Sequence, residues 1–359
     1  MKIFFVLGRN PELSRAEILS YLAARNRPHK EIAFDENLLI LETNEGEKIN
    51  IQELGGTMKL GPITFEGNQK EFEIYLNTNE IIPADKFSYA IFGNLDPEPL
   101  KEKFKSEKKK GMLRHGRKQI KFQDGAKQEL PKAEFNLFFH QFKQKIYFGT
   151  ATQNYNNEEV KKRDMQKPSR REYLAISPRL SKILINLSGA KPRDLLLDPF
   201  CGVGGIIQET LLKQINAHGI DKDKEATIDA EKNLKWLKEN YNIKTKYKIE
   251  NYDSRKAPDL QFAAIATETP LGKVLRKKPS ENEAKQIILN FEAFIIPILT
   301  RLKKVKKPTA KIAITFPVIQ NFHVDTEKIA NKTNLKITQN PILESRPDQF
   351  ISRDIIVFQ

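Results

Sequence analysis

Two kinds of hydrophobic pattern follow one another along this chain. From about residue 190 onward, short apolar runs alternate with segments whose apolar residues recur at helical spacing. This pattern predicts strands at 194–197, 217–220, 247–250, 263–266, 310–316 and 355–358, and helices near 206–215, 224–240 and 281–304. Because strands that alternate with helices form parallel sheets, we expect an α/β fold with a doubly wound sheet.

The first 150 residues show a mixed α+β pattern instead. We expect strands at 3–7 and 38–42, and between them a helix opened by the capping box Ser14–Glu17. A glycine-rich turn at 54–61 leads into another strand. Further on, the pattern predicts a helix at 100–110 and strands at 120–122, 135–140 and 145–151.

These patterns divide the chain into four parts. Residues 1–62 and 63–152 are predicted as two α+β domains, 153–173 as a connector too polar for a core, and 174–359 as the α/β domain. Ser177 and Pro178 predict the first helix of the last part, since serine is a favoured N-cap and proline suits the first turn.

Composition narrows the class of protein. At 359 residues the chain is long enough for two or three domains with cores of their own. No stretch approaches the roughly 20 apolar residues of a membrane span, so we expect no such span. The single cysteine, Cys201, excludes an intramolecular disulfide and a cysteine-rich metal site. We therefore expect a cytoplasmic protein without bound metal.

Positive charge is concentrated in three segments. The net charge is +15, and 101–121 carries +8, 161–172 carries +4, and 301–307 holds five basic residues and no acid. Such clustering favours a phosphate-bearing partner such as RNA, although a solvated lysine-rich surface is the alternative. The candidate RNA-binding residues are Lys108, Lys109, Lys110, Arg114, Arg117, Lys118, Arg163, Arg170 and Arg171.

The segment from Leu195 to Ile206 carries the most specific chemistry. Three leucines predict a buried strand, a glycine turn follows, and a helix begins after it. Strand, glycine turn and helix together form a cradle for a nucleotide-like ligand, because glycine lets the backbone approach closely. The carboxylate of Asp198 would repel a pyrophosphate but suits a cationic ligand with an amino group, which indicates S-adenosylmethionine. The alternative is a purely structural turn.

Three further acids follow predicted strands and are expected at the same edge of the sheet. Asp221 lies seventeen residues after Gly204, a spacing that suits the two ribose hydroxyls of the cofactor. Asp253 is a candidate for the adenine amino group, and Glu268 for orienting an exocyclic amine that accepts the methyl group. Each acid is alternatively a helix cap or a solvated loop residue. Asp223 competes with Asp221, but we expect it to cap the following helix.

The chain resembles the THUMP-domain tRNA guanosine-N2-methyltransferases of archaea and eukaryotes. The resemblance rests on Asp198–Gly202 with Gly204 and Gly205, and on the segments Phe5–Leu13, Gly55–Lys59, Arg163–Asp164, Arg170–Arg171, Ile176–Leu180, Arg346–Gln349 and Arg353–Ile355. It implies a ferredoxin-like domain over 1–62, a THUMP RNA-binding domain over 63–152 and a Rossmann-like methyltransferase domain over 174–359. The implied cofactor-binding residues are Ser177, Asp198, Pro199, Phe200, Cys201, Gly202, Gly204, Asp221 and Asp253.

The family's catalytic loop usually has the sequence Asp-Pro-Pro-Tyr-Gly, and this chain departs from it. The matching positions run from Glu268 to Gly272, so the catalytic candidates are Glu268, Pro270 and Leu271. Glutamate reaches about one methylene further than aspartate, and Leu271 supplies no π-face to a target base.

The resemblance implies a monomeric enzyme that uses S-adenosylmethionine to methylate the N2 amine of a guanosine in tRNA, at position ten. Two alternatives stay open. One is an adenine or cytosine amino-methyltransferase acting on DNA or other RNA. The other is a catalytically inactive RNA-binding protein.

Overall fold

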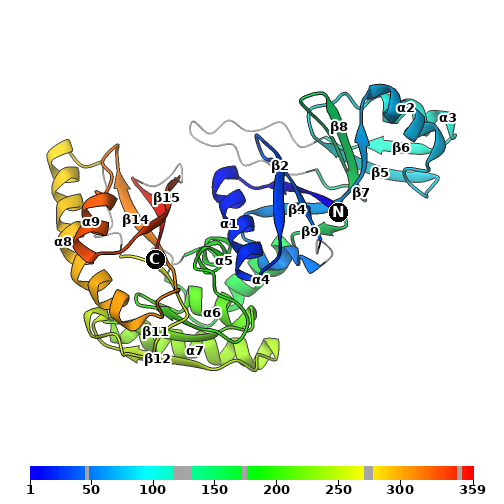
Figure 1. Ribbon diagram of the computed structural model, residues 1–359. Helices are drawn as coiled ribbons and strands as arrows, with labels where there is room; N and C mark the ends of the chain where they lie inside the picture. Colours follow the sequence, from blue (N-terminus) through cyan, green and yellow to red (C-terminus); the bar gives the residue numbers. More distant parts are fainter. Residues whose placement is uncertain (45–47, 116–130, 172–175, 271–277, 346–349) are drawn as a thin grey trace. The chain divides into compact units, whose positions relative to one another are not determined.

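The computed structural model describes residues 1–44, 48–115, 131–171, 176–270, 278–345 and 350–359 (Figure 1). It divides into two compact units. The first comprises 1–15, 27–52 and 56–155, and the second comprises 16–26, 53–55 and 156–359. The second unit has the α/β fold that the sequence predicted, whereas the first is a mostly antiparallel sheet with helices, in line with the α+β pattern of the first 150 residues.

The first unit is built on one nine-stranded sheet in the order β2-β3-β1-β4-β8-β7-β5-β6, with β9 paired to β4. Its strands are β1 (Lys2–Leu7), β2 (His29–Asp35), β3 (Leu38–Thr43), β4 (Thr57–Gly67), β5 (Lys86–Phe92), β6 (Lys110–Leu113), β7 (Phe135–Phe142), β8 (Lys145–Thr150) and β9 (Gln153–Asn154). Strand β4 pairs with β1 through its first half and with β8 through its second, so the boundary predicted at residue 62 falls inside a strand.

Helices α2 (Gln69–Thr78) and α3 (Glu98–Ser106) accompany this sheet, whereas α1 (Pro11–Ala24) begins in the first unit and belongs to the second from residue 16 onward. Helix α1 begins before the predicted capping box, because the side chain of Asn10 already accepts a hydrogen bond from the Leu13 N–H. The predicted helix 100–110 ends at Ser106, and Lys108 takes a left-handed conformation with φ of 57° before β6 begins. The strand predicted at 120–122 lies outside the described residues.

The second unit holds a seven-stranded sheet in the order β12-β11-β10-β13-β14-β16-β15. Its strands are β10 (Leu195–Asp198), β11 (Asn216–Asp221), β12 (Tyr247–Asn251), β13 (Ala264–Glu268), β14 (Ile312–Ile319), β15 (Ile337–Glu344) and β16 (Ile351–Phe358). The first five in sheet order are parallel, whereas β16 runs antiparallel to both β14 and β15.

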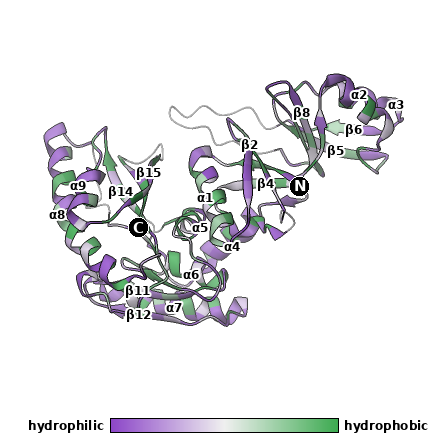
Figure 2. Cartoon of the chain, in the orientation of Figure 1, coloured by the Kyte–Doolittle hydropathy of each residue, from purple (hydrophilic) through white to green (hydrophobic). Residues whose placement is uncertain are grey.

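Helices cover both faces of this sheet, with α8 and α9 on one side and α5 on the other (Figure 1). They are α4 (Asn157–Gln166), α5 (Pro178–Leu187), α6 (Gly205–Leu212), α7 (Lys224–Tyr241), α8 (Glu281–Val305) and α9 (Thr326–Thr333), with a short 3₁₀ turn η3 (Ser254–Lys256). Helix α5 is buried from Leu180 to Leu187, whereas green and purple residues alternate along α7 (Figure 2). Helix α4 occupies much of the predicted connector.

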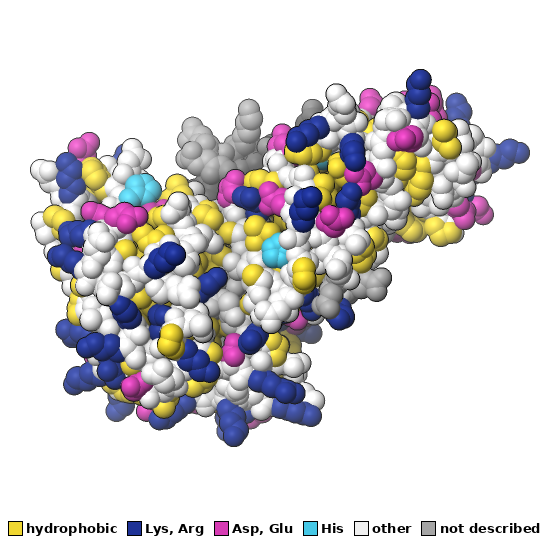
Figure 3. Space-filling model, in the orientation of Figure 1, with side chains coloured by type: hydrophobic (Ala, Val, Ile, Leu, Met, Phe, Trp, Pro, Cys, Tyr) yellow, Lys and Arg dark blue, Asp and Glu magenta, His cyan; other side chains and the backbone are white. Residues whose placement is uncertain are grey.

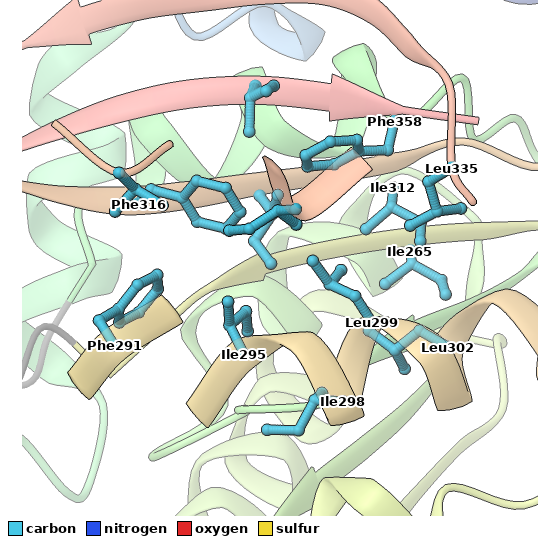
Figure 4. Packing of buried hydrophobic residues seen from close by; sticks show 14 of the residues in the cluster. Ile265, Phe291, Ile295, Ile298, Leu299, Leu302, Ile312, Phe316, Leu335 and Phe358 are labelled. Carbon is cyan, nitrogen blue, oxygen red and sulfur yellow. The ribbon is translucent and has the colours of Figure 1, made fainter. Parts of the chain in front are cut away.

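The core of this unit lies between α8 and the sheet. Phe291, Ile295 and Leu299 project from α8 toward Ile265 of β13 and Phe316 of β14 (Figure 4). Each such side chain stabilises the fold by about 1.5–3 kcal/mol when it is fully buried. This packing fixes the strand ends on which the candidate site stands.

No helix in the described part of the chain is both long and apolar enough to cross a membrane.

Candidate cofactor and catalytic site

The glycine turn between β10 and α6 adopts the backbone that the sequence predicted. Gly202 and Gly204 have φ angles of 49° and 84°, which side-chain-bearing residues rarely adopt. A Cβ built on Gly202 would meet no atom within 4 Å, so the turn faces open space at this point. The Cys201 N–H donates to the carbonyl of Ile220 at 2.9 Å, which ties the turn to β11.

Asp198 ends β10 and is only 1% exposed. Its Oδ1 accepts hydrogen bonds from the Thr267 hydroxyl at 2.6 Å and from the Phe200 N–H at 3.2 Å. Burial raises the pKa of Asp198 to about 7, and the carboxylates of Asp221 and Glu268 act in the same direction. A cationic ligand would favour the ionised form of Asp198. This acidic cradle therefore fits a ligand such as S-adenosylmethionine, which carries positive charge.

Asp221 ends β11 and braces the same turn. Its Oδ2 accepts from the Gly202 N–H at 2.8 Å, and its Oδ1 from the Asp223 N–H at 2.9 Å. Asp223 caps α7, where its Oδ1 accepts from the N–H groups of Glu225 and Ala226. The prediction that Asp223 caps α7 is thus confirmed. Binding of the ribose hydroxyls by Asp221 stays a prediction.

Asp253 follows β12 and caps η3 through the Arg255 N–H. The guanidinium of Arg255 also donates to both carboxylate oxygens, at 2.9 and 2.6 Å. The hydrogen bond from the Arg255 side chain lowers the pKa of Asp253 to about 2. Its neighbour Ser254 donates to the carbonyl of Pro199, which joins this loop to the glycine turn.

Glu268 ends β13, beside Thr315 of β14. Arg353 of β16 donates from Nε to Glu268 Oε1, a contact between residues 85 positions apart that no sequence pattern identified. The next residue, Thr269, is anchored to β14 because its hydroxyl donates to the Thr315 carbonyl at 2.6 Å. Pro270 is exposed, and Leu271 lies outside the described residues.

The remaining predicted cofactor residues have structural contacts of their own. Ser177 caps α5 by accepting from the Leu180 N–H at 3.2 Å, as predicted for a helix start. Phe200 packs against Phe294 of α8 with ring centroids 5.9 Å apart. Cys201 is buried, and burial raises the pKa of its thiol well above the usual value.

Three of the predicted RNA-binding cations are instead paired inside the protein. Arg163 is 5% exposed, and its guanidinium contacts Glu209 at 2.7 Å and Glu159 at 2.9 Å. Burial by itself lowers the pKa of Arg163, but the carboxylate of Glu209 more than reverses this and raises it.

Lys109 is similarly held, with Nζ 2.7 Å from Glu80. Arg171 contacts Asp223 at 3.0 Å and Asp229 at 3.1 Å. These contacts occupy the three cations within the protein, and a role for them in RNA binding stays a prediction. Four other predicted cations are exposed, namely Lys108, Lys110, Arg114 and Arg170. Arg117 and Lys118 lie outside the described residues.

A groove in the first unit supplies cations that the sequence reasoning missed. It has a volume of about 600 Å³ and crosses β1, β2 and the β7–β8 turn. The basic and aromatic side chains that line it are Lys2, Lys30, Lys143, Lys145, Phe142 and Tyr147. Glu66 pairs with Lys2 and Lys145. These lysines are distributed along the chain, so no local run of charge identified them. Basic side chains are also spread over much of the surface visible in Figure 3.

Comparisons with known proteins agree with this geometry. Residues 168–290 match the UPF0020 family, described as an RMKL-like methyltransferase domain. A tRNA (guanine(10)-N2)-dimethyltransferase of Pyrococcus abyssi is 26% identical over 278 residues, which cover 74% of this chain and 77% of that relative. One of Methanothermobacter thermautotrophicus is 36% identical over 99 residues, 27% of this chain and only 28% of that relative.

A solved structure shares the fold across the whole chain. TrmN from Thermus thermophilus superposes with a TM-score of 0.56 at 11% sequence identity, covering 100% of both chains. At this identity the likeness shows the fold alone. Together the comparisons confirm the resemblance that the motifs from Asp198 to Gly205 indicated.

Proposed function

We propose that this chain belongs to the tRNA guanine-N2-methyltransferase family and methylates the N2 amine of a guanosine in tRNA, with S-adenosylmethionine as methyl donor. The observation that carries the proposal is the acid pair at neighbouring strand ends, with Asp198 buried on β10 and Glu268 on β13. The names of its relatives, tRNA (guanine(10)-N2)-dimethyltransferases, support position ten as the target. We place the reaction in the cytoplasm, because a chain with a single cysteine suits a reducing compartment.

The cofactor half of the site would bind S-adenosylmethionine through the charge of Asp198 and through close approach of the ligand to the backbone at Gly202. In its ionised form the Asp198 carboxylate would attract the positively charged part of S-adenosylmethionine, and the open space at Gly202 would let the ligand approach the backbone. Asp221 and the N–H groups of the turn keep this cradle rigid. When bound, the cofactor supplies an activated methyl group on a sulfonium sulfur.

The substrate half of the site would act on the amine. The lone pair of the guanosine N2 atom is delocalised into the base, so its nucleophilicity is low. Glu268 accepts a hydrogen bond from the amine and orients that lone pair toward the methyl carbon. When N2 receives the methyl group, positive charge would develop on this nitrogen, and the Glu268 carboxylate would stabilise it until an N2 proton leaves to solvent.

The first unit would bind the RNA backbone. The groove lined by Lys30 and Lys143 combines cations with the aromatic side chains of Phe142 and Tyr147. Phosphates would be attracted to these cations, whereas Tyr147 is only 4% exposed and belongs to the hydrophobic core, so the cations carry the proposed contact. The exposed residues Lys108, Lys110 and Arg114 offer further cations beside β6, at the other edge of the same sheet.

The test is methyl transfer to unmodified tRNA, followed by identification of the product nucleoside. The protein is incubated with a tRNA transcript and methyl-labelled S-adenosylmethionine, and the digested nucleosides are separated by mass spectrometry. We expect N2-methylguanosine or its dimethylated form. Methylated adenosine or cytidine would favour an amino-methyltransferase of different specificity. Absence of label from every nucleic acid offered would favour an inactive RNA-binding protein.

A further inference from the structure

We propose that Arg353 is a positioning residue, which holds the Glu268 carboxylate in the orientation required for methyl transfer; this inference rests on the proposed function. Arg353 Nε donates to Glu268 Oε1. The contact is shielded from water, because only 8% of the Arg353 side chain and 14% of the Glu268 side chain are exposed. An ion pair in such surroundings restrains both side chains more firmly than one on the surface.

Sheet register explains how residues so far apart in sequence meet. Glu268 pairs with Thr315 of β14, and Arg353 pairs with Pro317 two residues further along the same strand. Paired residues share a face of the sheet, as do residues two apart on one strand. The Arg353 side chain therefore crosses over β14 on the face that carries Glu268.

A second acid fixes Arg353 from the other side. Glu344 pairs with Arg353 in the β15–β16 register, and its Oε2 lies 3.8 Å from Arg353 Nη1. Arg353 thus stands between two carboxylates, and the guanidinium plane is held between β13 and β15. Because its Nε engages Oε1, the other oxygen of Glu268 remains the acceptor for the substrate amine in our proposal.

The backbone after Glu268 is restrained as well. Thr269 donates from its N–H to Thr315 Oγ1 at 3.2 Å and from its hydroxyl to the Thr315 carbonyl at 2.6 Å. A proline, which the resembling family usually has here, has no N–H to donate. In this chain two hydrogen bonds restrain the backbone at Thr269, where the family usually has a proline ring. Arg353 restrains the side chain of Glu268, which is one methylene longer than aspartate.

Kinetics of Arg353 variants test this assignment. We expect Arg353→Gln to lower kcat by about 100-fold, the effect of a misplaced catalytic group, while the KM for tRNA and the Kd for S-adenosylmethionine change by less than about twofold. Arg353→Lys keeps the charge but loses the planar Nε donor, so it recovers part of kcat. If Arg353→Gln fails to fold, Arg353→Lys still provides the comparison.

Two further variants separate positioning from general stability. Because Arg353 acts through Glu268, the double variant Glu268→Gln/Arg353→Gln should be no slower than Glu268→Gln alone. Arg25→Gln is the matched control, because Arg25 contacts Glu53 at 2.7 Å in an ion pair that includes none of the predicted site residues, and its kcat should stay at the wild-type value.

Two results overturn the assignment. One is an unchanged kcat for Arg353→Gln, and the other is a double variant whose losses multiply. In both cases the active wild-type protein leaves the proposed function intact. A wild-type protein that methylates no guanosine overturns the proposed function and this inference together.

Discussion

The Thr267 hydroxyl donates a 2.6 Å hydrogen bond to the buried carboxylate of Asp198 and so joins the ends of β13 and β10. Both groups lie inside the protein, where Thr267 is 0% and Asp198 1% exposed. Through this bond, the strand that carries Glu268 is coupled to the acid of the cofactor cradle.

Thr267→Val should weaken cofactor binding. Hydrogen bonds to charged groups contribute about 1.5–3 kcal/mol, so we expect the Kd for S-adenosylmethionine to rise by roughly tenfold or more. The measurement is isothermal titration calorimetry. Thr333→Val is the matched control, because it removes a buried hydroxyl that donates to the Ile329 carbonyl in α9. Equal affinities for the two variants would contradict the role of Thr267.

Cofactor affinity should rise with pH through about 7. Burial raises the pKa of Asp198 to about 7, so the carboxyl is largely protonated at pH 6 and ionised at pH 8. A cationic ligand binds the ionised form better and lowers this pKa further. We therefore expect the Kd to fall by up to about tenfold between pH 6 and pH 8. The Asp198→Asn variant should bind S-adenosylmethionine weakly, with a Kd that does not change between pH 6 and pH 8. If this variant kept the pH dependence of the wild type, Asp198 would be excluded as the titrating group.

The same pKa has a consequence for stability without cofactor. Because the pKa of Asp198 is higher in the folded protein than in the unfolded chain, its protonation favours the fold. The contribution is complete below the unfolded value and is lost as pH rises through about 7. Thermal unfolding should show this loss in the wild type and its absence in Asp198→Asn.

Arg163→Met should destabilise the fold rather than weaken RNA binding specifically. It leaves the carboxylate of Glu209 buried without its closest partner, at a cost of about 3–5 kcal/mol. Denaturant unfolding measures this loss. Arg170→Met, an exposed change a few residues away, should alter stability by less than about 0.5 kcal/mol. Wild-type stability in Arg163→Met, together with weaker tRNA binding, would restore Arg163 to the RNA-binding surface.

Lys30 and Lys143 should contribute to the salt dependence of tRNA binding. Each phosphate contact removed lowers the slope of log K against log salt by about 0.7–0.9. We therefore expect the double variant Lys30→Ala/Lys143→Ala to reduce the slope by about 1.5. Lys235→Ala, an exposed change on α7, is the control for lost surface charge. An unchanged slope in the double variant would remove the groove from the RNA-binding surface.

How much the sequence could predict depends on how local the determining contacts are. The turn at Gly202 and the cap at Asp223 follow from adjacent residues, and both were predicted. Strand β15 was missed because it is an edge strand of mostly polar residues that contains Pro341. Helix α9 was missed because only three of its eight residues are buried.

Contacts between residues far apart in sequence determine the features that the sequence did not predict. The basic run at Arg163 indicated an exposed surface, but Glu209, 46 residues later, draws that guanidinium into the interior. Arg353 stands out in the sequence only as part of a family motif, and its contact with Glu268 depends on the order of three neighbouring strands. No hydrophobic period or charge count contains that information.

The most direct measurement replaces the proposed acceptor amine in the substrate. A tRNA is assembled with inosine in place of guanosine at position ten; inosine lacks the N2 amine and keeps the rest of the base. We predict full methyl transfer to the guanosine-containing tRNA and no label at position ten of the inosine-containing tRNA, with both binding equally well. Methylation of the inosine-containing tRNA at the wild-type rate would contradict the assignment of this protein as a guanosine-N2-methyltransferase acting at that position.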